Sequence, residues 1–328
     1  MDKSRIQGHV AILCTSLIFG INIPLSKNLM PNWMSPLGMT YSRFAFGAIA
    51  FWLLSAFLKS EKVTRKDMGM LFLGSILGVG LNQASFIFGL EHTSATNASI
   101  VITITPILAM IISFFILKEP ITFKKVGGVV IGLIGVLSMI LTSEVSSSGR
   151  EASMIGDLLC VTSSLSYAFF LVLMRGISKR YNSVTIMKWM FLFSALMFLP
   201  FGFKEVSSAR IFSDGTPAAW GSYLYLLVGA TFITYLLIPM AQRRIRPTTI
   251  GMYNYLQPLV ASYIAIMWGQ DIFSWTKPVS ALLIFAGVYF VTTSKSREDI
   301  ERERQLKLDK ANSDALLVLP IMDPIKKG

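Results

Sequence analysis

Apolar residues fill this chain in long runs that are separated by short polar segments. Ten runs can be traced, and each is close to the roughly 17 to 25 residues that an α-helix needs to cross a bilayer. The pattern therefore predicts ten membrane-spanning helices, over residues 8–30, 36–58, 68–90, 94–117, 124–142, 154–175, 185–203, 220–242, 248–270 and 275–294.

Composition agrees with a membrane protein and argues against several other classes. Hydrophobic residues make up 53% of the 328 residues and charged residues 15%, whereas about a quarter of a soluble domain is charged. The two cysteines, Cys14 and Cys160, lie in apolar runs and form no disulfide or zinc-binding motif. His9 and His92 lack acidic or thiol neighbours at metal-ligand spacing, so we expect neither a metal nor a cofactor.

Positive charge is concentrated on one side of the predicted helices. If the amino terminus is inside, the inner segments hold 23 of the 30 Lys and Arg residues, and the outer segments hold five. Cytoplasmic segments of membrane proteins carry such an excess. We therefore expect both termini in the cytoplasm, a multi-pass location in the cell (inner or plasma) membrane, and no nucleic-acid partner for the net charge of +12. Residues 295–328 form a charged cytoplasmic tail that is expected to be disordered or a short helix.

The second half of the chain repeats the first. An offset of 148 positions aligns Gly8 with Gly156 and Ser16 with Ser164. After a longer loop near 203–219, an offset of 152 positions aligns Gly69 with Gly221, Thr96 with Thr248, Pro106 with Pro258, Ala109 with Ala261 and Gly135 with Gly287. Because a unit of five helices crosses the membrane an odd number of times, the second unit must enter from the opposite side. The fold class predicted is an all-α integral membrane protein of two inverted five-helix repeats, 8–142 and 154–294, an architecture that recurs in secondary transporters.

Several segments resemble ten-span members of the drug/metabolite transporter superfamily, of the EamA type. They are GHVAILCTSLIFG, SRFAFGAIAF, SATNASIVITITPILAMIISFFILKEPITFKKVGGVVIGLIGV and TTIGMYNYLQPLVASYIAIMWGQDIFSW. The resemblance covers about residues 8–294 and implies export of small metabolites, with the substrate left open. The second copy departs from the family pattern at Asp271, where glutamate is usual, and at Val279, where glycine is usual. These departures leave the expected fold unchanged but weaken any claim that Asp271 copies the role of Glu119.

Two prolines occupy equivalent positions in the fourth and ninth predicted helices. Proline removes a backbone donor and clashes with the preceding turn, so Pro106 and Pro258 are expected to break their helices. Interrupted helices at related positions of two halves mark transport sites where they line a wet cavity. Packing kinks are the alternative explanation.

Polar side chains at the same depth predict a cavity between the halves. A spacing of four places Asn97, Val101 and Thr105 on one face of the fourth predicted helix. The same spacing places Thr249, Tyr253 and Gln257 on the matching face of the ninth. Since polar groups at this depth avoid lipid, the expected substrate-binding residues are Asn22, Arg43, Asn82, Gln83, Asn97, Thr105, Tyr167, Tyr253 and Gln257. For each of them a hydrogen bond between helices is the competing explanation. Tyr167, Tyr235 and Tyr255 could add aromatic walls to the cavity or could be ordinary packing and interface residues, and only Tyr167 is selected.

Charged residues bear on the substrate and on the driving force. Arg43, about seven residues into the second predicted helix, either binds a substrate carboxylate or phosphate, or snorkels or pairs with helix-end carbonyl oxygens. The middles of the predicted helices contain no carboxylate, which argues against a deep proton relay. If protons drive transport, Glu91, His92 and Asp157 near the outer face are the candidates. Glu119 is expected to cap the next helix or to pair with a lysine.

The sequence predicts a secondary transporter that exports small organic metabolites, such as amino acids or related compounds. Its partners are a small-molecule substrate and the lipid bilayer, and either a monomer or a homodimer is compatible with the sequence. An intramembrane enzyme is disfavoured, because paired aspartates, a Ser-His pair and HExxH are absent from the predicted helices. A membrane sensor or assembly protein is the other alternative. Gly128 and Gly132 form a small-residue face that favours close helix packing within one chain.

Overall fold

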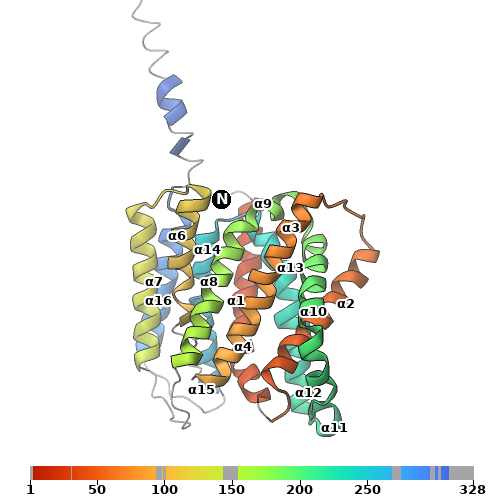
Figure 1. The fold of residues 1–328 in the computed structure, drawn as a ribbon. Helices are drawn as coiled ribbons and strands as arrows, with labels where there is room; N and C mark the ends of the chain where they lie inside the picture. Colours follow the sequence, from red (N-terminus) through yellow and green to blue (C-terminus); the bar gives the residue numbers. More distant parts are fainter. Residues whose placement is uncertain are drawn as a thin grey trace, which may run out of the picture.

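Helices are the regular elements of this computed structural model (Figure 1), which describes residues 3–30, 32–93, 98, 101–142, 154–267, 275–295, 300–301 and 304–309. Asn97, the 143–153 connector and Asp271 lie outside the described residues. The first half contains α1 (Lys3–Leu29), α2 (Pro36–Ala56), α3 (Arg65–Gly74), η1 (Ser75–Leu81), α4 (Asn82–His92), α6 (Thr105–Leu117) and α7 (Phe123–Thr142). The second half contains α8 (Met154–Leu173), α9 (Arg175–Arg180), α10 (Ser183–Ser207), α11 (Ile211–Asp214), α12 (Pro217–Leu224), η2 (Tyr225–Ile233), α13 (Thr234–Gln242), α14 (Pro247–Tyr253), α15 (Leu256–Met267) and α16 (Thr276–Thr292).

The length and hydropathy of these helices fit a multi-pass membrane protein. Among the described residues, six helical stretches are long and apolar enough to cross a bilayer: Lys3–Leu29, Pro36–Ala56, Arg65–His92, Met154–Leu173, Ser183–Asp214 and Pro217–Gln242. Two shorter apolar helices are Thr105–Leu117 and Pro278–Thr292. Large apolar side chains such as Phe115, Phe201 and Leu282 are exposed on the outside of the bundle, where lipid would cover them.

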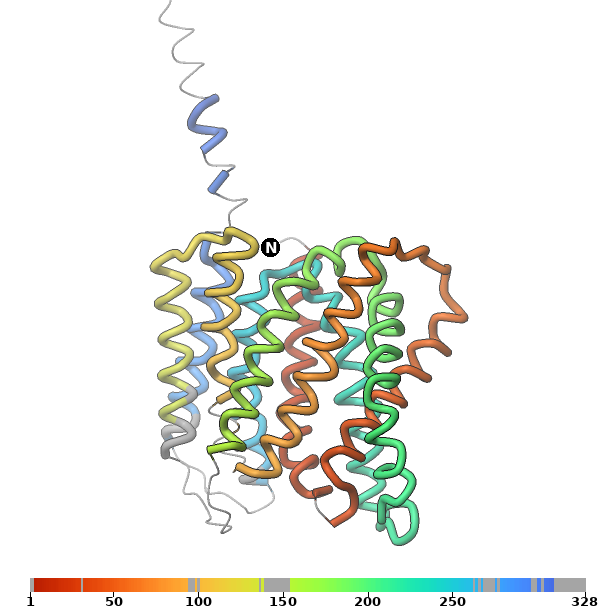
Figure 2. The backbone as a smooth tube through the Cα atoms, in the orientation of Figure 1, coloured from red at the N-terminus to blue at the C-terminus, as the bar shows by residue number. Residues whose placement is uncertain are grey.

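Each half of the chain packs mainly against the other half. The most extensive contacts join α7 to α16, α2 to α10, α4 to α8 and α6 to α8. The start of α1 and the end of α16 lie at the same end of the bundle (Figure 2). The two halves are therefore interleaved, and a space at the centre of the bundle has walls from both.

The offset of 152 positions also relates local structure in the two halves. Thr64 caps α3 by accepting a hydrogen bond from the backbone N–H of Asp67, and Thr216 caps α12 in the same way from Ala219, both at 3.2 Å. In the first half α3 continues directly into the π-helical segment η1, and in the second half α12 continues directly into the π-helical segment η2. Short π-helical insertions of this kind are frequent at functional sites.

Glycines let the helices of the two halves approach closely. A Cβ atom added to Gly128 of α7 would lie 2.8 Å from the backbone oxygen of Gly287 of α16, and one added to Gly287 would lie 2.6 Å from that of Gly128. In η1, a Cβ on Gly78 would overlap the Phe170 ring. Small residues thus allow close packing within one chain.

We predict that Gly128→Ile forces α7 away from α16 and destabilises the protein by at least about 1 kcal/mol, because overpacking a close helix contact displaces backbone. The matched control is Gly127→Ile, since an added Cβ there meets nothing within 4 Å. Thermal unfolding of the detergent-purified protein measures both. An equal loss of stability in the two variants would contradict the close contact.

Candidate functional site

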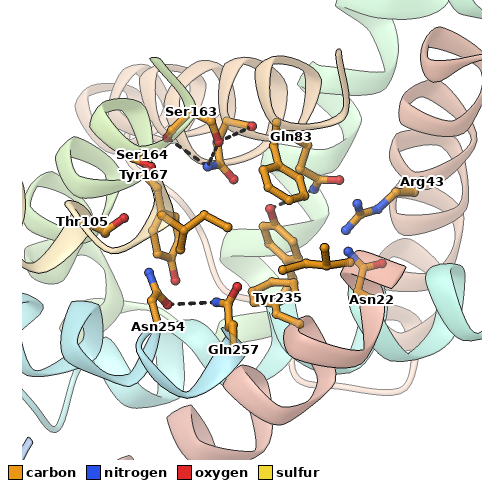
Figure 3. Close-up of a pocket in the computed structure, with 15 residues that line it drawn as sticks. Asn22, Arg43, Gln83, Thr105, Ser163, Ser164, Tyr167, Tyr235, Asn254 and Gln257 are labelled. Carbon is orange, nitrogen blue, oxygen red and sulfur yellow. Dashed lines mark hydrogen bonds between the residues drawn. The ribbon is translucent and has the colours of Figure 1, made fainter. Parts of the chain in front are cut away.

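A cavity lies between the two halves of the chain (Figure 3). The space open to the centre of a water molecule is about 80 Å³, several times the roughly 10–15 Å³ that one water needs, and most of the lining residues have polar side chains. The cavity can therefore hold several waters or a small polar ligand. Its lining residues are Phe19, Asn22, Ile23, Arg43, Asn82, Gln83, Phe86, Ile102, Thr105, Ser163, Ser164, Tyr167, Tyr235, Asn254 and Gln257.

Residues at equivalent positions of the two halves meet in this cavity. Gln83 and Tyr235 are 152 positions apart, and Nε2 of Gln83 donates a hydrogen bond to the Tyr235 hydroxyl oxygen at 2.8 Å. Thr105 and Gln257 are separated by the same number of positions and both line the cavity. The cavity therefore lies where related positions of the two halves converge.

A chain of hydrogen bonds fixes the orientation of Gln83 and Tyr235. The Tyr235 hydroxyl donates to the backbone oxygen of Gly78, in η1, at 2.9 Å. Because a carbonyl can only accept, the Tyr235 proton is committed to that bond, and the hydroxyl oxygen must accept from the Gln83 amide nitrogen. The side chains of both residues are buried. These hydrogen bonds hold Gln83 and Tyr235 in place and provide a partner for a backbone carbonyl of the π-helical segment.

Arg43 is tied to the other π-helical segment. Its side chain is buried, with 3% of the residue exposed, and Nε donates to Oγ1 of Thr231 at 2.8 Å while Nη2 donates to the backbone oxygen of Ala230 at 2.9 Å. Both acceptors belong to η2. The sequence left open a pairing with helix-end carbonyls, whereas the Ala230 carbonyl lies inside η2, which continues into α13. Arg43 is also the one charged residue among the fifteen described residues that line the cavity.

Helix interruptions precede the two equivalent prolines. Turns at 103–104 and 254–255 stand directly before α6, which contains Pro106, and α15, which contains Pro258. In each turn one backbone N–H bonds three residues back, from Ile104 to Val101 and from Tyr255 to Met252, both at 3.1 Å. The second turn carries Asn254, whose Oδ1 accepts from Nε2 of Gln257 at 3.2 Å.

Seven of the nine expected cavity residues line this cavity, namely Asn22, Arg43, Asn82, Gln83, Thr105, Tyr167 and Gln257. Tyr253 lies elsewhere, with its hydroxyl 3.0 Å from Nδ1 of His9. The helix face inferred from a spacing of four ends at Tyr253, because the helix is interrupted at 254–255.

The structure adds polar lining residues that the sequence analysis did not select. Ser163 and Asn82 exchange hydrogen bonds, with Nδ2 of Asn82 donating to Oγ of Ser163 at 2.9 Å and that Oγ donating to the Asn82 backbone oxygen at 2.8 Å. Tyr235, for which the sequence left a cavity wall and ordinary packing both open, and Asn254 also line the cavity. The sequence could have indicated Tyr235 as a cavity residue, because it lies 152 positions after Gln83, at the offset of the internal repeat.

Comparison with known proteins identifies the family. The model of the EamA-like transporter family matches residues 6–141 and 154–293. This chain belongs to the EamA-like transporter family. Like its relatives in this family, the protein is a membrane transporter of small molecules. The family resemblance seen in the sequence is confirmed.

Individual relatives of this EamA-like transporter are distant but span most of the chain. The uncharacterized transporter YetK of Bacillus subtilis (strain 168) is 23% identical over 90% of both chains. An S-adenosylmethionine/S-adenosylhomocysteine transporter of Chlamydia muridarum (strain MoPn / Nigg) is 27% identical over 77% of this chain and 81% of its own. A crystal structure with 17% identity superposes with a TM-score of 0.67 over 88% of this chain and 96% of the other, so the two share a fold.

In this EamA-like transporter the candidates for proton coupling lie outside the cavity lining. Oδ1 of Asp157 accepts a hydrogen bond from Oγ1 of Thr93 at 2.6 Å. Oε2 of Glu91 is 3.7 Å from Nδ1 of His92, whose side chain is half exposed. Within the described ranges, no three His, Cys, Asp or Glu side chains gather as metal ligands. Proton coupling through these residues stays a prediction.

Glu119 pairs with two cations after α6 of the transporter. Its carboxylate oxygens lie 2.9 Å from Nζ of Lys125 and 2.7 Å from Nη1 of Arg175. Lys125 and Glu119 are almost fully buried, and Arg175 comes from the second half. The lysine partner agrees with one of the two expectations for Glu119.

We predict that Glu119→Gln destabilises this EamA-like transporter by about 3 kcal/mol, because it leaves the ammonium of Lys125 buried without its counter-charge. Asp214→Asn is the control, since the Arg210–Asp214 pair is largely exposed and such pairs contribute little. Thermal unfolding in detergent gives the comparison. If the two substitutions had equal effects, the buried ion pair would not be a major contributor.

Proposed function

We propose that this protein is a secondary transporter that exports a small organic molecule bearing a carboxylate, by alternating access to the cavity between its halves. The observation that supports this substrate is Arg43, a buried cation in the wall of a cavity whose other described lining residues are uncharged. A guanidinium binds a carboxylate through paired, charge-assisted hydrogen bonds. Amides and hydroxyls from both halves supply further donors and acceptors. Amino acids and related compounds have this chemistry.

The name of one relative agrees with this substrate class. S-adenosylmethionine and S-adenosylhomocysteine, named for the Chlamydia muridarum relative, both carry an amino-acid carboxylate. We propose that the substrate of this protein has the carboxylate that these two compounds share with simple amino acids.

The proposed architecture is ten membrane-spanning helices in two inverted repeats, 8–142 and 154–294. Support comes from the contacts between the halves, in which α2 meets α10 and α7 meets α16, and from helix caps and π-helical segments at the same offset. Inverted halves can exchange conformations and open a shared cavity to one face and then the other. The excess of Lys and Arg in the inner segments supports cytoplasmic termini, a cytoplasmic tail over 295–328 and a place in the cell membrane.

The proposal is tested by counterflow into proteoliposomes, with a panel of amino acids and, for each acid, the amine that lacks only the carboxylate. We predict that acids are carried and that the matching amines are not. Arg43→Gln should lower the rate at least about tenfold, because a charged hydrogen-bonding partner of the substrate is lost. Thr162→Val is the matched control, since Thr162 is exposed on α8 beside Ser163 and bonds its own helix at the Leu158 oxygen.

Two results would contradict the proposed function. One is equal transport of the acids and the amines by the wild-type protein. The other is full transport by Arg43→Gln protein that has the same thermal stability as wild type. Arg43→Lys separates charge from geometry, since lysine keeps the charge but loses the paired donors.

A further inference from the structure

The two π-helical segments hold equivalent places, and each presents a carbonyl oxygen to a cavity side chain of the opposite half. The Gly78 oxygen of η1 accepts from Tyr235, and the Ala230 oxygen of η2 accepts from Arg43. Gly78 and Ala230 are 152 positions apart. A π turn shifts the backbone hydrogen-bond ladder, so side chains of neighbouring helices can donate to carbonyl groups in it.

The two bonds differ in their response to an anion in the cavity. Tyr235 is neutral, and its hydroxyl is committed between Gln83 and Gly78. Arg43 uses the adjacent donors Nε and Nη2 on Thr231 and Ala230, and this edge of the guanidinium is one that a carboxylate can grip with both oxygens. An anionic acceptor forms stronger hydrogen bonds than a neutral carbonyl or hydroxyl. A carboxylate in the cavity therefore competes with η2 for Arg43 but not with η1 for Tyr235.

Loss of Arg43 leaves the acceptors of η2 with other partners. The Ala230 oxygen also accepts from Oγ1 of Thr234 at 2.9 Å, and Oγ1 of Thr231 donates to the Leu226 oxygen at 2.9 Å. Withdrawal of the guanidinium thus strands no buried oxygen of this pair, which keeps its cost low. The segment η2 itself packs against both α1 and α2 of the first half. A change in the conformation of η2 therefore changes the packing between the two halves.

We propose that the contact of Arg43 with Ala230 and Thr231, termed the Arg43 latch, couples substrate binding to the conformation of η2. The substrate carboxylate takes the guanidinium from η2, and the released segment changes its packing against the first half. The bond from Tyr235 holds η1 throughout, so the two equivalent segments respond differently. This inference rests on the proposed function in that the substrate carries a carboxylate.

The test uses the full chain in lipid nanodiscs, amide hydrogen exchange of residues 225–233 and 75–81, and sodium acetate as the carboxylate probe against sodium chloride at equal pH and ionic strength. In wild type, acetate should speed exchange in 225–233 and leave 75–81 unchanged. Arg43→Gln should show fast exchange in 225–233 without acetate and no further response to it.

Thr231→Val separates the latch from a merely structural contact. It removes one of the two acceptors that compete with acetate, so the half-saturating acetate concentration should fall by about tenfold. The matched control is Ser194→Ala, because Oγ of Ser194 on α10 donates to the Ser75 oxygen of η1 at 3.2 Å, the counterpart of the contact between α2 and η2. It should speed exchange only in 75–81 and leave the acetate response unchanged.

The latch is overturned if acetate leaves the exchange of 225–233 unchanged, or if Thr231→Val raises the half-saturating concentration. Failure of the proposed function gives a different result. In that case no carboxylic acid of the counterflow panel is carried, while acetate still releases η2 through Arg43.

Discussion

The hydrocarbon core of a bilayer offers no hydrogen-bond partners, and this constraint explains the polar contacts at the centre of the bundle. A polar group at that depth must find its partner inside the bundle. Asn82 and Ser163 satisfy each other, Gln83 and Tyr235 form a chain that ends on a backbone oxygen, and Arg43 is held by η2. All five side chains line one cavity, so the polar groups that avoid lipid also line the cavity in which we propose that the substrate binds.

The same contacts join the two halves. Each π-helical segment has a carbonyl whose partner comes from the other half, and the glycines of α7 and α16 bring the backbones of the two halves together away from the cavity. Apolar packing therefore holds the outer part of the interface, while a few hydrogen bonds hold the centre. Close-packed apolar side chains leave few voids and cannot easily rearrange. The donor of a hydrogen bond, in contrast, can exchange one acceptor for another. The centre is thus the part of the interface that a ligand can change.

Much of the helical content and of the cavity lining follows from the sequence, because polar residues inside apolar runs are few. Asn22, Gln83 and Arg43 are polar residues within such runs. Because polar groups at this depth avoid lipid, their side chains are expected to face the interior of the bundle. The placement of Tyr253 required a continuous helix, and the turn at 254–255 ends that helix one residue later. The π-helical segments and the acceptors of Arg43 are backbone features that side-chain identity does not encode. Ser163 and Ser164 were not selected, because serine in a helix commonly bonds its own backbone.

The central claim is that the two halves lie in the membrane with opposite orientation around one cavity. It is tested most directly at the loops that join α2 to α3 and α10 to α12, which lie at opposite ends of the bundle (Figure 1). Ser60 and Ser213 are exposed in these loops, and single cysteines at either position, with Cys14 and Cys160 replaced, can be labelled by a reagent that does not cross the membrane. The account predicts that Ser60→Cys reacts only from the cytoplasmic side and Ser213→Cys only from the outside. Labelling of both from the same side would contradict it.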